Sequence, residues 1–332
     1  MLRFGYKAAT EQFGPQELLE YVRLAEQVGF DSIWASDHFH PWMPEGEAIH
    51  VWSWLGALGA KTSTISLGTE VTAPILRYNP AIIAQAVGTL GVLYPGRVFL
   101  GLGTGEALNE YPTTGKWPAY QERHDMLKEA VEIIRKLLME DYVTYEGKYF
   151  HLRDAKLFTK PSGGIPIYLA AGGPESTELA GELGDGFITT SKPEQFEQKL
   201  KDALLKGLQR AGKDIKSFPI IGEIPLAYST AEAVLPDIRK YWGSLSLEKE
   251  THDPKKLGNL KEREKWTRGI GDEQLLKAYF ISTDPEEHVE KLKSYIQAGF
   301  TTLVFRSPQR DQKQFIINYG RYVLPALQKE FA

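Results

Sequence analysis

The sequence predicts a (β/α)8 barrel, the TIM-barrel fold, with two insertions. Short apolar runs rich in β-branched residues alternate with amphipathic stretches of helical period, which is the order typical of parallel βα units. Eight such pairs fit within 332 residues, and no Pro/Ser-rich linker divides them. We therefore expect a single barrel domain over residues 1–332.

The first four pairs each join a strand to a following helix. In chain order they are 2–6 with 15–30, 31–36 with 51–62, 65–73 with 80–94, and 97–105 with 123–140. Asn79 and Pro80 mark the start of the third helix, because Asn is a good N-cap and Pro suits the first helical position.

The remaining four pairs follow the same rule. They are 165–173 with 175–184, 185–191 with 194–212, 218–229 with 231–243, and 301–307 with a final helix. A further apolar run, 278–283, precedes a helix at 284–300, and the pattern leaves its place in the sheet open.

Two segments interrupt the alternation. Residues near 141–158 read as a β-hairpin that turns at Glu146 and Gly147, and residues 244–271 are a polar stretch rich in Lys, Glu and Gly. We expect both to be insertions outside the barrel.

Composition excludes several classes of function. The formal net charge is −4 and no long basic block exists, so nucleic acid and anionic membrane surfaces are not expected partners. Without cysteine, the chain has no disulfide, thiolate metal site or cysteine nucleophile. The N-terminus lacks a signal-peptide pattern and no apolar run is long enough to span a bilayer, so we expect a cytoplasmic protein that acts on a small molecule.

Polar residues follow most of the predicted strands. The carboxyl ends of barrel strands carry the active site, so these side chains should gather at one mouth. They are Glu11; Asp37, His38 and His40; Glu70 and Thr72; Thr104, Gly105, Glu106 and Asn109; Gly172 and Gly173; and Thr190, Ser191 and Lys192.

The stretch "SDHFHP", residues 36–41, allows three interpretations: a metal site, a proton-transfer site, or a polar turn. A barrel metal site with an H-x-H pair needs further ligands after later strands. The other histidines lie elsewhere, so we expect no metal; they are His50, His124, His151, His252 and His288. For His38 a structural role stays open.

Glu106 is the most suggestive carboxylate, because an acid opposite a histidine from another strand suits proton transfer. A solvated or helix-capping glutamate is the alternative. Trp42 follows the histidines and either lines a pocket or belongs to the core.

Two glycine clusters are ambiguous. "GLGTG", residues 101–105, misses the dinucleotide fingerprint, so it marks either a tight turn or close backbone approach to a ligand. "AAGGPES", residues 170–176, precedes a helix whose N-terminus favours an anion, although a simple turn has the same sequence.

Taken together, "SDHFHPW", "RYNPAIIAQA", "LYPGRVFLGLGTGEALNE", "AAGGP" and "GDGFITTS" resemble the deazaflavin-dependent branch of the bacterial luciferase-like family. The similarity is greatest to its sugar-phosphate dehydrogenases and runs along nearly the whole chain. It implies a cytoplasmic homodimer of carbohydrate metabolism. The implied reaction is hydride transfer from C1 of a sugar 6-phosphate to coenzyme F420, which turns glucose 6-phosphate into 6-phosphogluconolactone.

The resemblance also implies roles for individual residues. His38 and Glu106 would be the proton-transfer pair, with Trp42 beside them; we favour Glu106 as acceptor and His38 as donor, and the reverse is chemically reasonable. The residues implied for the cofactor ring and chain are Asp37, Glu70, Val71, Ala73, Thr104, Gly105 and Asn109, with a cis peptide at Glu70–Val71. Those implied for its phosphate are Gly172, Gly173, Glu175 and Ser176. Ala73 replaces a threonine of the best-known relatives.

The substrate site is where the sequence departs from the family pattern. The implied residues are Glu11, Thr190, Lys192 and Lys249, but Ala278 stands where an arginine is expected, with Lys277 adjacent. An F420-dependent secondary-alcohol dehydrogenase is therefore the main rival. A glycosidase using Glu106 with Glu223 and a non-catalytic luciferase-like protein are alternatives from other classes.

Overall fold

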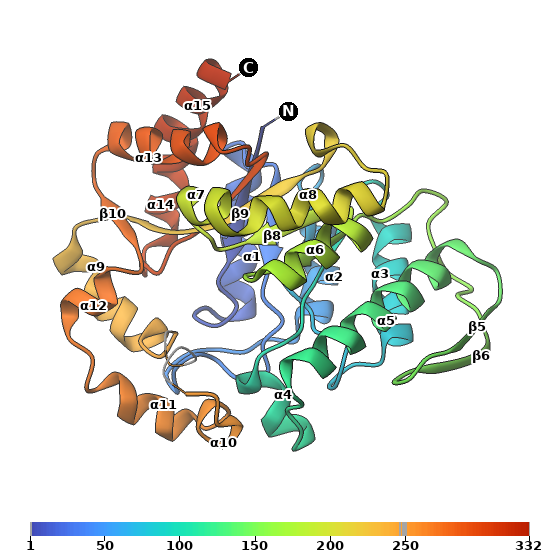
Figure 1. Ribbon diagram of the computed structural model, residues 1–332. Helices are drawn as coiled ribbons and strands as arrows, with labels where there is room; N and C mark the ends of the chain where they lie inside the picture. The colour runs from blue at the N-terminus through green and yellow to red at the C-terminus, as the bar shows by residue number, and fades with distance from the viewer. Residues whose placement is uncertain (1, 246, 248–250, 332) are drawn as a thin grey trace.

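Eight parallel strands close into a barrel, as the sequence predicts (Figure 1). The computed structural model describes residues 2–245, 247 and 251–331. Pairing of β8 with β9 and of β11 with β1 completes the ring. In order around the barrel the strands are β1 (Arg3–Ala8), β2 (Ser32–Ala35), β3 (Ser66–Thr69), β4 (Val98–Leu102), β7 (Ile167–Ala170), β8 (Gly186–Thr189), β9 (Ile220–Tyr228) and β11 (Thr302–Arg306).

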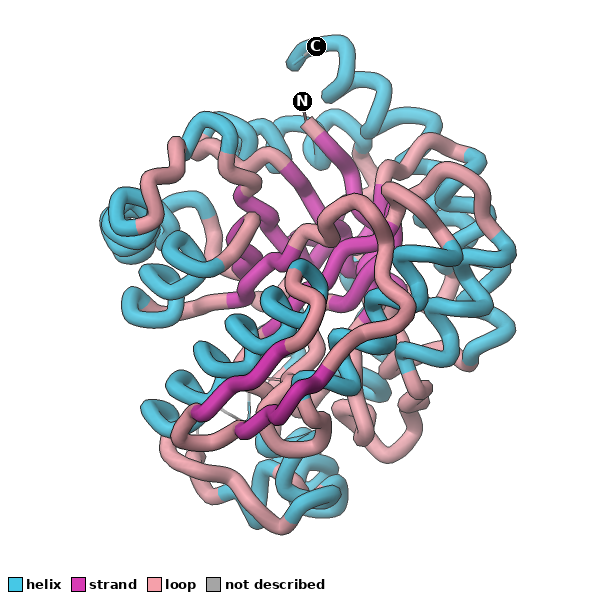
Figure 2. Tube along the Cα trace, turned by 90° about the vertical axis from the view of Figure 1, so that its right-hand side faces the viewer, coloured by secondary structure: helices cyan, strands magenta, loops and turns pink. Residues whose placement is uncertain are grey.

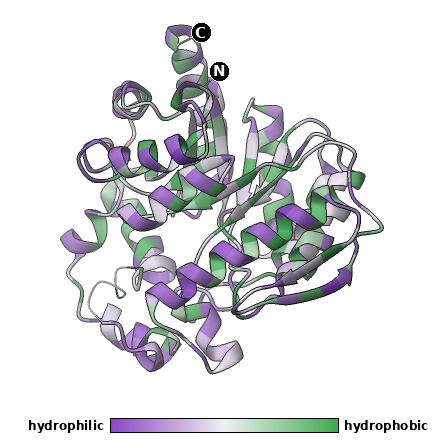
Figure 3. Cartoon of the chain, turned by 45° about the vertical axis from the view of Figure 1, so that its right-hand side comes forward, coloured by the Kyte–Doolittle hydropathy of each residue, from purple (hydrophilic) through white to green (hydrophobic). Residues whose placement is uncertain are grey.

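Helices surround this sheet, and Figure 2 shows them enclosing the strands. Their hydrophilic and hydrophobic residues alternate in bands (Figure 3), as expected for helices with one face on a core. The helix α3 begins as predicted, since the Asn79 side chain accepts a hydrogen bond from the Ala81 N–H at 2.8 Å. The outer helices are α1 (Pro15–Gln27), α2 (Val51–Lys61), α3 (Pro80–Leu93), α5 (Tyr120–Met139), α6 (Pro174–Leu183), α7 (Pro193–Gln195), α8 (Lys201–Arg210), α9 (Ala231–Asp237), α13 (Pro285–Gln297), α14 (Gln312–Asn318) and α15 (Leu324–Phe331).

The run at 278–283, which the sequence pattern leaves unplaced, contains a strand outside the ring. Strand β9 is nine residues long, and its first part pairs with β8 and β11. Its last three residues, 226–228, pair instead with β10 (Phe280–Ser282). Because β9 outruns its barrel neighbours, it offers an edge beyond the ring to which β10 adds.

Aromatic rings fill the barrel toward the N-terminal ends of its strands. The ring centroid of Trp34 lies 4.1 Å from that of Phe99 and 5.8 Å from that of Tyr168. Glycine on a neighbouring strand makes the room: a Cβ on Gly5 would lie 2.6 Å from Trp34 Nε1. A barrel filled in this way leaves the other mouth for a ligand.

Both predicted insertions have structure of their own. The hairpin consists of β5 (Val143–Glu146) and β6 (His151–Ala155), antiparallel and set apart from the barrel strands in Figure 2. The late segment carries the short helices α10 (Pro254–Leu257) and α11 (Leu260–Thr267), followed by α12 (Asp272–Leu276). In Figure 1 these helices lie on the same side of the barrel as α4 (Ala107–Thr114), which α10 contacts.

Across residues 2–245, 247 and 251–331, no helix is long and apolar enough to cross a membrane.

Candidate active site

A cavity of about 740 Å³ opens at the carboxyl ends of the strands. The structure brings most of the predicted site residues together on its wall. They are Glu11, Asp37, His38, Trp42, Glu70, Val71, Ala73, Thr104, Gly105, Glu106, Asn109, Gly172 and Thr190.

Of the residues that the resemblance implies for the site, four lie outside this lining and one cannot be placed; His40, Thr72 and Ser191, predicted from strand ends alone, are also outside it. Gly173 and Ser176 are at the start of α6, where the Ser176 hydroxyl donates to the Gly173 carbonyl at 3.2 Å. Glu175 lies between them in the first helical turn, and Lys192 is an exposed residue directly before α7. Lys249 falls outside the described residues.

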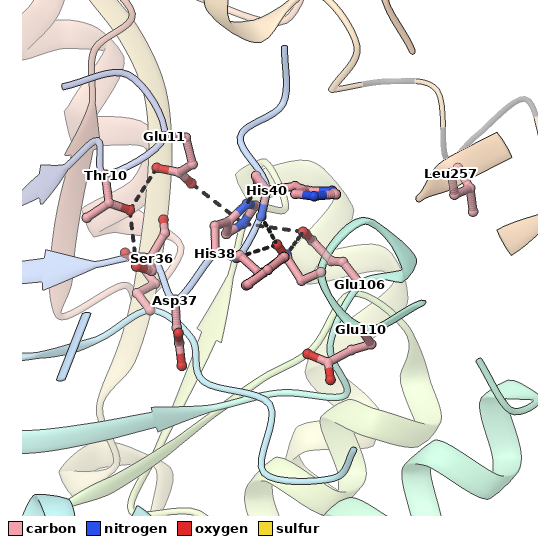
Figure 4. Close-up of polar contacts among 12 residues, drawn as sticks. Thr10, Glu11, Ser36, Asp37, His38, His40, Glu106, Glu110 and Leu257 are labelled. Atoms are coloured by element: carbon pink, nitrogen blue, oxygen red, sulfur yellow. Dashed lines mark hydrogen bonds and ion pairs between the residues drawn. The ribbon is translucent and has the colours of Figure 1, made fainter. Parts of the chain in front are cut away.

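His38 sits between two carboxylates. Its Nε2 lies 3.3 Å from Glu106 Oε2 and 3.6 Å from Glu11 Oε1, and Figure 4 shows these acids on opposite sides of the ring. Its Nδ1 lies 3.1 Å from the His40 carbonyl oxygen, which only accepts, so Nδ1 carries a proton. Burial lowers the pKa of His38, although Glu11 opposes this shift. In the neutral ring Nε2 carries no proton, so a hydrogen bond between Nε2 and either acid needs a proton on that carboxyl group.

Glu106 faces the cavity from the residue before α4, with 34% of its side chain exposed. It makes no side-chain capping bond to that helix, which removes the helix-capping interpretation. Asn109 donates from Nδ2 to Glu106 Oε2 at 3.3 Å, while its Oδ1 accepts from the Phe39 and His40 N–H groups. One amide thus ties the loop after β2 to the loop after β4.

Trp42 is fixed from two sides. Its ring centroid lies 5.2 Å from that of His38, and the guanidinium carbon of Arg263 lies 5.3 Å from its ring. The Ser244 hydroxyl donates to the Trp42 carbonyl at 2.5 Å and accepts from Arg263. Since Ser244 and Arg263 belong to the late insertion, that segment helps to build the cavity wall.

Asp37 is buried and already held by protein donors. Its carboxylate accepts from Thr72 Oγ1 at 2.8 Å, from the Tyr78 hydroxyl at 3.2 Å and from Arg77 Nη1 at 3.3 Å. Arg77 also donates to Glu110. Sequence reasoning missed Arg77, Tyr78 and Glu110 as parts of the site. The motif "RYNPAIIAQA" begins with Arg77 and Tyr78, and the motif "LYPGRVFLGLGTGEALNE" ends with Glu110, so these motifs were the only signals.

Four charged side chains from the barrel interior meet at the cavity floor. Lys7 Nζ donates to Glu70 Oε2 at 3.1 Å and lies 3.5 Å from Glu223 Oε2, while Arg306 Nε donates to Glu223 Oε1 at 2.5 Å. Burial raises the pKa of Glu70. For Glu223, burial is outweighed by Lys7 and Arg306, which lower its pKa. With both oxygens engaged by cations, Glu223 is not available to act with Glu106 as a glycosidase pair.

The glycine loop packs against the backbone bulge after β3. The Glu70–Val71 peptide is cis, as the resemblance implies. A Cβ on Gly103 would lie 2.7 Å from Val71 Cγ2, and Gly105, with φ of 74°, faces Ala73. Close backbone approach thus explains these two glycines.

No three His, Cys, Asp or Glu side chains within the part of the chain that the structure describes are grouped to hold a metal ion.

Comparisons with known proteins agree on one family. The luciferase-like monooxygenase family model matches residues 2–302. An F420-dependent glucose-6-phosphate dehydrogenase of Microbacterium testaceum is 44% identical, over 100% of this chain and 99% of that protein. The corresponding enzyme of Segniliparus rotundus is also 44% identical, over 98% of each.

Solved structures give the same fold. An F420-dependent secondary alcohol dehydrogenase, in complex with an F420-acetone adduct, superposes with a TM-score of 0.91 at 33% identity, covering 98% of this chain and 99% of that chain. The F420-dependent tetrahydromethanopterin reductase of Methanopyrus kandleri has a TM-score of 0.79 at 24% identity, over 98% and 99% of the two chains, and supports the fold alone. This chain is a member of the luciferase-like monooxygenase family.

Proposed function

We propose that this protein oxidises glucose 6-phosphate at C1 and uses coenzyme F420 as the hydride acceptor. The observation that carries the proposal is the convergence of His38, Glu106 and Trp42 on one cavity wall, in a chain 44% identical over its full length to an F420-dependent glucose-6-phosphate dehydrogenase. The enzyme is thus an oxidoreductase acting on a CH–OH group, with a place in carbohydrate metabolism.

The residues present fit a deazaflavin. The bulge at Glu70–Val71 and the glycine loop at 103–105 form a backbone cradle that a Cβ on Gly103 would fill. Open space adjoins Gly172 and Gly173, and the first N–H groups of α6 have no intrahelical acceptor, which suits a phosphate. We assign the ring and chain to Asp37, Glu70, Val71, Ala73, Thr104, Gly105 and Asn109, and the cofactor phosphate to Gly172, Gly173, Glu175 and Ser176.

Coenzyme F420, when bound, supplies a carbon that accepts a hydride. The protein must then remove the proton of the substrate hydroxyl, and the neutral His38 offers an Nε2 lone pair in the cavity. Glu106 Oε2, at 3.3 Å, is placed to take that proton onward. This geometry favours His38 as the base and Glu106 as its partner, the reverse of the assignment we favour from sequence.

We place the substrate phosphate at the cavity rim. Thr190, Lys277 and Ala278 line that rim, and Lys192 lies two residues beyond Thr190. Lys277 pairs with Glu273 at 3.0 Å in an exposed position, where such pairs are worth little and exchange readily for a phosphate. Glu11, beside His38, lies toward the reacting end of the sugar.

The secondary-alcohol dehydrogenase alternative rests on the structural neighbour at 33% identity and on Ala278. The relatives at 44% identity favour the sugar phosphate. Initial rates with glucose 6-phosphate, glucose and isopropanol separate the two. Efficient oxidation of isopropanol without response to glucose 6-phosphate would refute the sugar-phosphate assignment.

Cofactor choice is tested separately. Fluorescence titration of the purified protein should detect oxidised F420 binding, with no binding of NADP or FMN. Sugar-phosphate oxidation that depends on NADP and needs no deazaflavin would refute the cofactor assignment. A protein that binds F420 but oxidises no alcohol would be the non-catalytic alternative.

We also propose a homodimer, joined through α2 and α3. The sequence of these adjacent helices contains no charged residue from Val51 to Ala60 or from Pro80 to Leu93. Ile82 and Leu93 are exposed on α3, by 56% and 57%. Sedimentation analysis should give a dimer that Ile82→Glu dissociates. The cytoplasmic location stays a prediction.

A further inference from the structure

Arg306 is a cavity residue to which the reaction described above assigns no role. It ends β11, is 6% exposed and contributes to the cavity wall. Its Nε is committed to Glu223, and Nη1 reaches the Tyr279 hydroxyl at 3.5 Å, the outer limit of a hydrogen bond. Within the described part of the chain, Nη2 has no hydrogen-bond partner.

The guanidinium is held so that these donors keep their direction. Its central carbon lies 4.9 Å from the Trp242 ring and 5.6 Å from the Tyr279 ring, and Trp242 is itself fixed by a 2.7 Å bond from Nε1 to Gln12 Oε1. Nη2 is accessible from the cavity and is not sealed in the packed interior, so a ligand can accept a hydrogen bond from it. A preorganised arginine with a spare nitrogen at a cavity wall is therefore expected to meet a ligand oxygen.

The charges around Arg306 indicate which oxygen. Two cations, Lys7 and Arg306, share this floor with Glu70 and Glu223, and Glu11 lines the same cavity. Both cations are already paired with Glu70 and Glu223, so the floor has little positive charge left for a phosphate. A hydroxyl group is suited to the floor, because it accepts from the guanidinium while it donates to a carboxylate.

The position also fits the reacting end of a sugar. Glu11 Oε1 lies 3.6 Å from His38 Nε2, and Glu11 lines the same cavity as Arg306. A sugar with C1 at His38 and its phosphate at the rim would turn its ring hydroxyls toward this floor.

We propose that Arg306, with Tyr279 beside it, hydrogen-bonds a ring hydroxyl of the sugar and so makes the enzyme select a polyhydroxylated ring over a simple alcohol. The inference rests on the proposed function and deepens it, because it names the group that recognises the ring rather than the phosphate.

The test combines one substitution in the protein with the removal of single hydroxyl groups from the substrate, and compares the two effects on kcat/KM. Arg306→Lys keeps the positive charge for Glu223 and removes the spare guanidinium donors. We expect kcat/KM for glucose 6-phosphate to fall about 10- to 100-fold, as for one hydrogen bond to a charged group. With the 2-, 3- and 4-deoxy analogues of glucose 6-phosphate, the loss caused by the substitution should disappear for the analogue that lacks the contacted hydroxyl.

Arg97→Lys is the matched control. This arginine is partly buried at the opposite end of the barrel, where it donates to the carbonyls of Ile65 and Thr62 at 3.0 and 3.1 Å. The ratios between substrates should not change in this variant. F420 titration of each variant checks that the cofactor site is intact.

Three outcomes overturn the inference. An equal penalty with every deoxy analogue and with isopropanol makes Arg306 structural. If the loss in kcat/KM caused by Arg306→Lys disappears with unphosphorylated glucose but persists with every deoxy analogue, Arg306 contacts the phosphate. An Arg306→Lys protein as active as the unaltered enzyme on glucose 6-phosphate shows that no contact exists. Failure of the unaltered protein to oxidise glucose 6-phosphate would instead refute the proposed function.

Chemical modification answers the same question if Arg306→Lys does not fold. The unaltered protein is treated with phenylglyoxal, an arginine reagent, with and without saturating glucose, and the labelled peptides are identified by mass spectrometry. Protection of Arg306 by glucose supports the inference. Labelling of Arg306 to the same extent in both samples contradicts it.

Discussion

Replacing Glu106 by glutamine isolates the proton-transfer step. The carboxylate accepts from Asn109 Nδ2 and lies 3.3 Å from His38 Nε2. Asn109 Nδ2 and His38 Nε2 both contact Oε2, and a glutamine of the same size can still place its amide oxygen there to accept from Asn109, so the loop geometry should survive. What glutamine cannot do is take a proton.

The expected loss follows from that single missing capacity. A positioned acid or base contributes about 10²- to 10⁴-fold, so kcat should fall at least about 100-fold, which is about 2.7 kcal/mol in the barrier. F420 affinity should stay close to that of the unaltered protein, because only the proton-accepting group has changed.

The assay follows the loss of deazaflavin absorbance at saturating glucose 6-phosphate over a range of pH. Glu122→Gln on α5 is the matched control, because Glu122 is an exposed acid in the first turn of a helix, and this variant should be fully active. A Glu106→Gln enzyme with near-normal kcat across that range would refute the reasoning and return Glu106 to a structural role.

Three further predictions follow from the site and its supports. Since burial lowers the pKa of His38, and a base works unprotonated, kcat/KM should be level near pH 7 and fall only below about pH 6.5, the ordinary histidine value; a decline that starts above pH 7 contradicts this. Gly103→Ala, whose Cβ would press on Val71, should lower the free energy of unfolding by about 1 to 3 kcal/mol in urea titration and weaken F420 binding in fluorescence; unchanged values would show that the cradle adapts. Arg263→Met leaves the Leu257 carbonyl, now bonded at 2.6 Å, without its donor, so urea denaturation should show that the free energy of unfolding falls by about 1 to 3 kcal/mol; unaltered stability would show that the Arg263 hydrogen bonds do not stabilise the late insertion.

The barrel was predictable because its strands and helices are local patterns of apolar residues. The run at 278–283 shows the limit of such reasoning. It has the composition of a barrel strand, yet it pairs beyond the ring, because β9 extends to Tyr228 while β11 pairs with it only as far as Pro225. Which strand 278–283 pairs with therefore depends on the length of β9, which the local sequence of 278–283 does not contain.

The candidate site residues that come directly after a strand could be predicted from the sequence. His38, Glu106 and Trp42 met at the cavity, but Lys7 and Arg306 were missed, because they lie within the strands themselves. A single charged residue in an apolar strand indicates that an oppositely charged partner exists, but the strand does not identify that partner. The partner of Lys7 is Glu70, 63 residues later.

The extension of β9 beyond the ring determines where the chain can accept an insertion. The late insertion lies between α9 and β10, both of which adjoin this overhang rather than the eight-strand circuit. Residues between α9 and β10 can therefore be added to the chain without interrupting any hydrogen bond of the eight-strand ring, because the segment leaves and rejoins the sheet where β9 has already passed beyond its barrel partners.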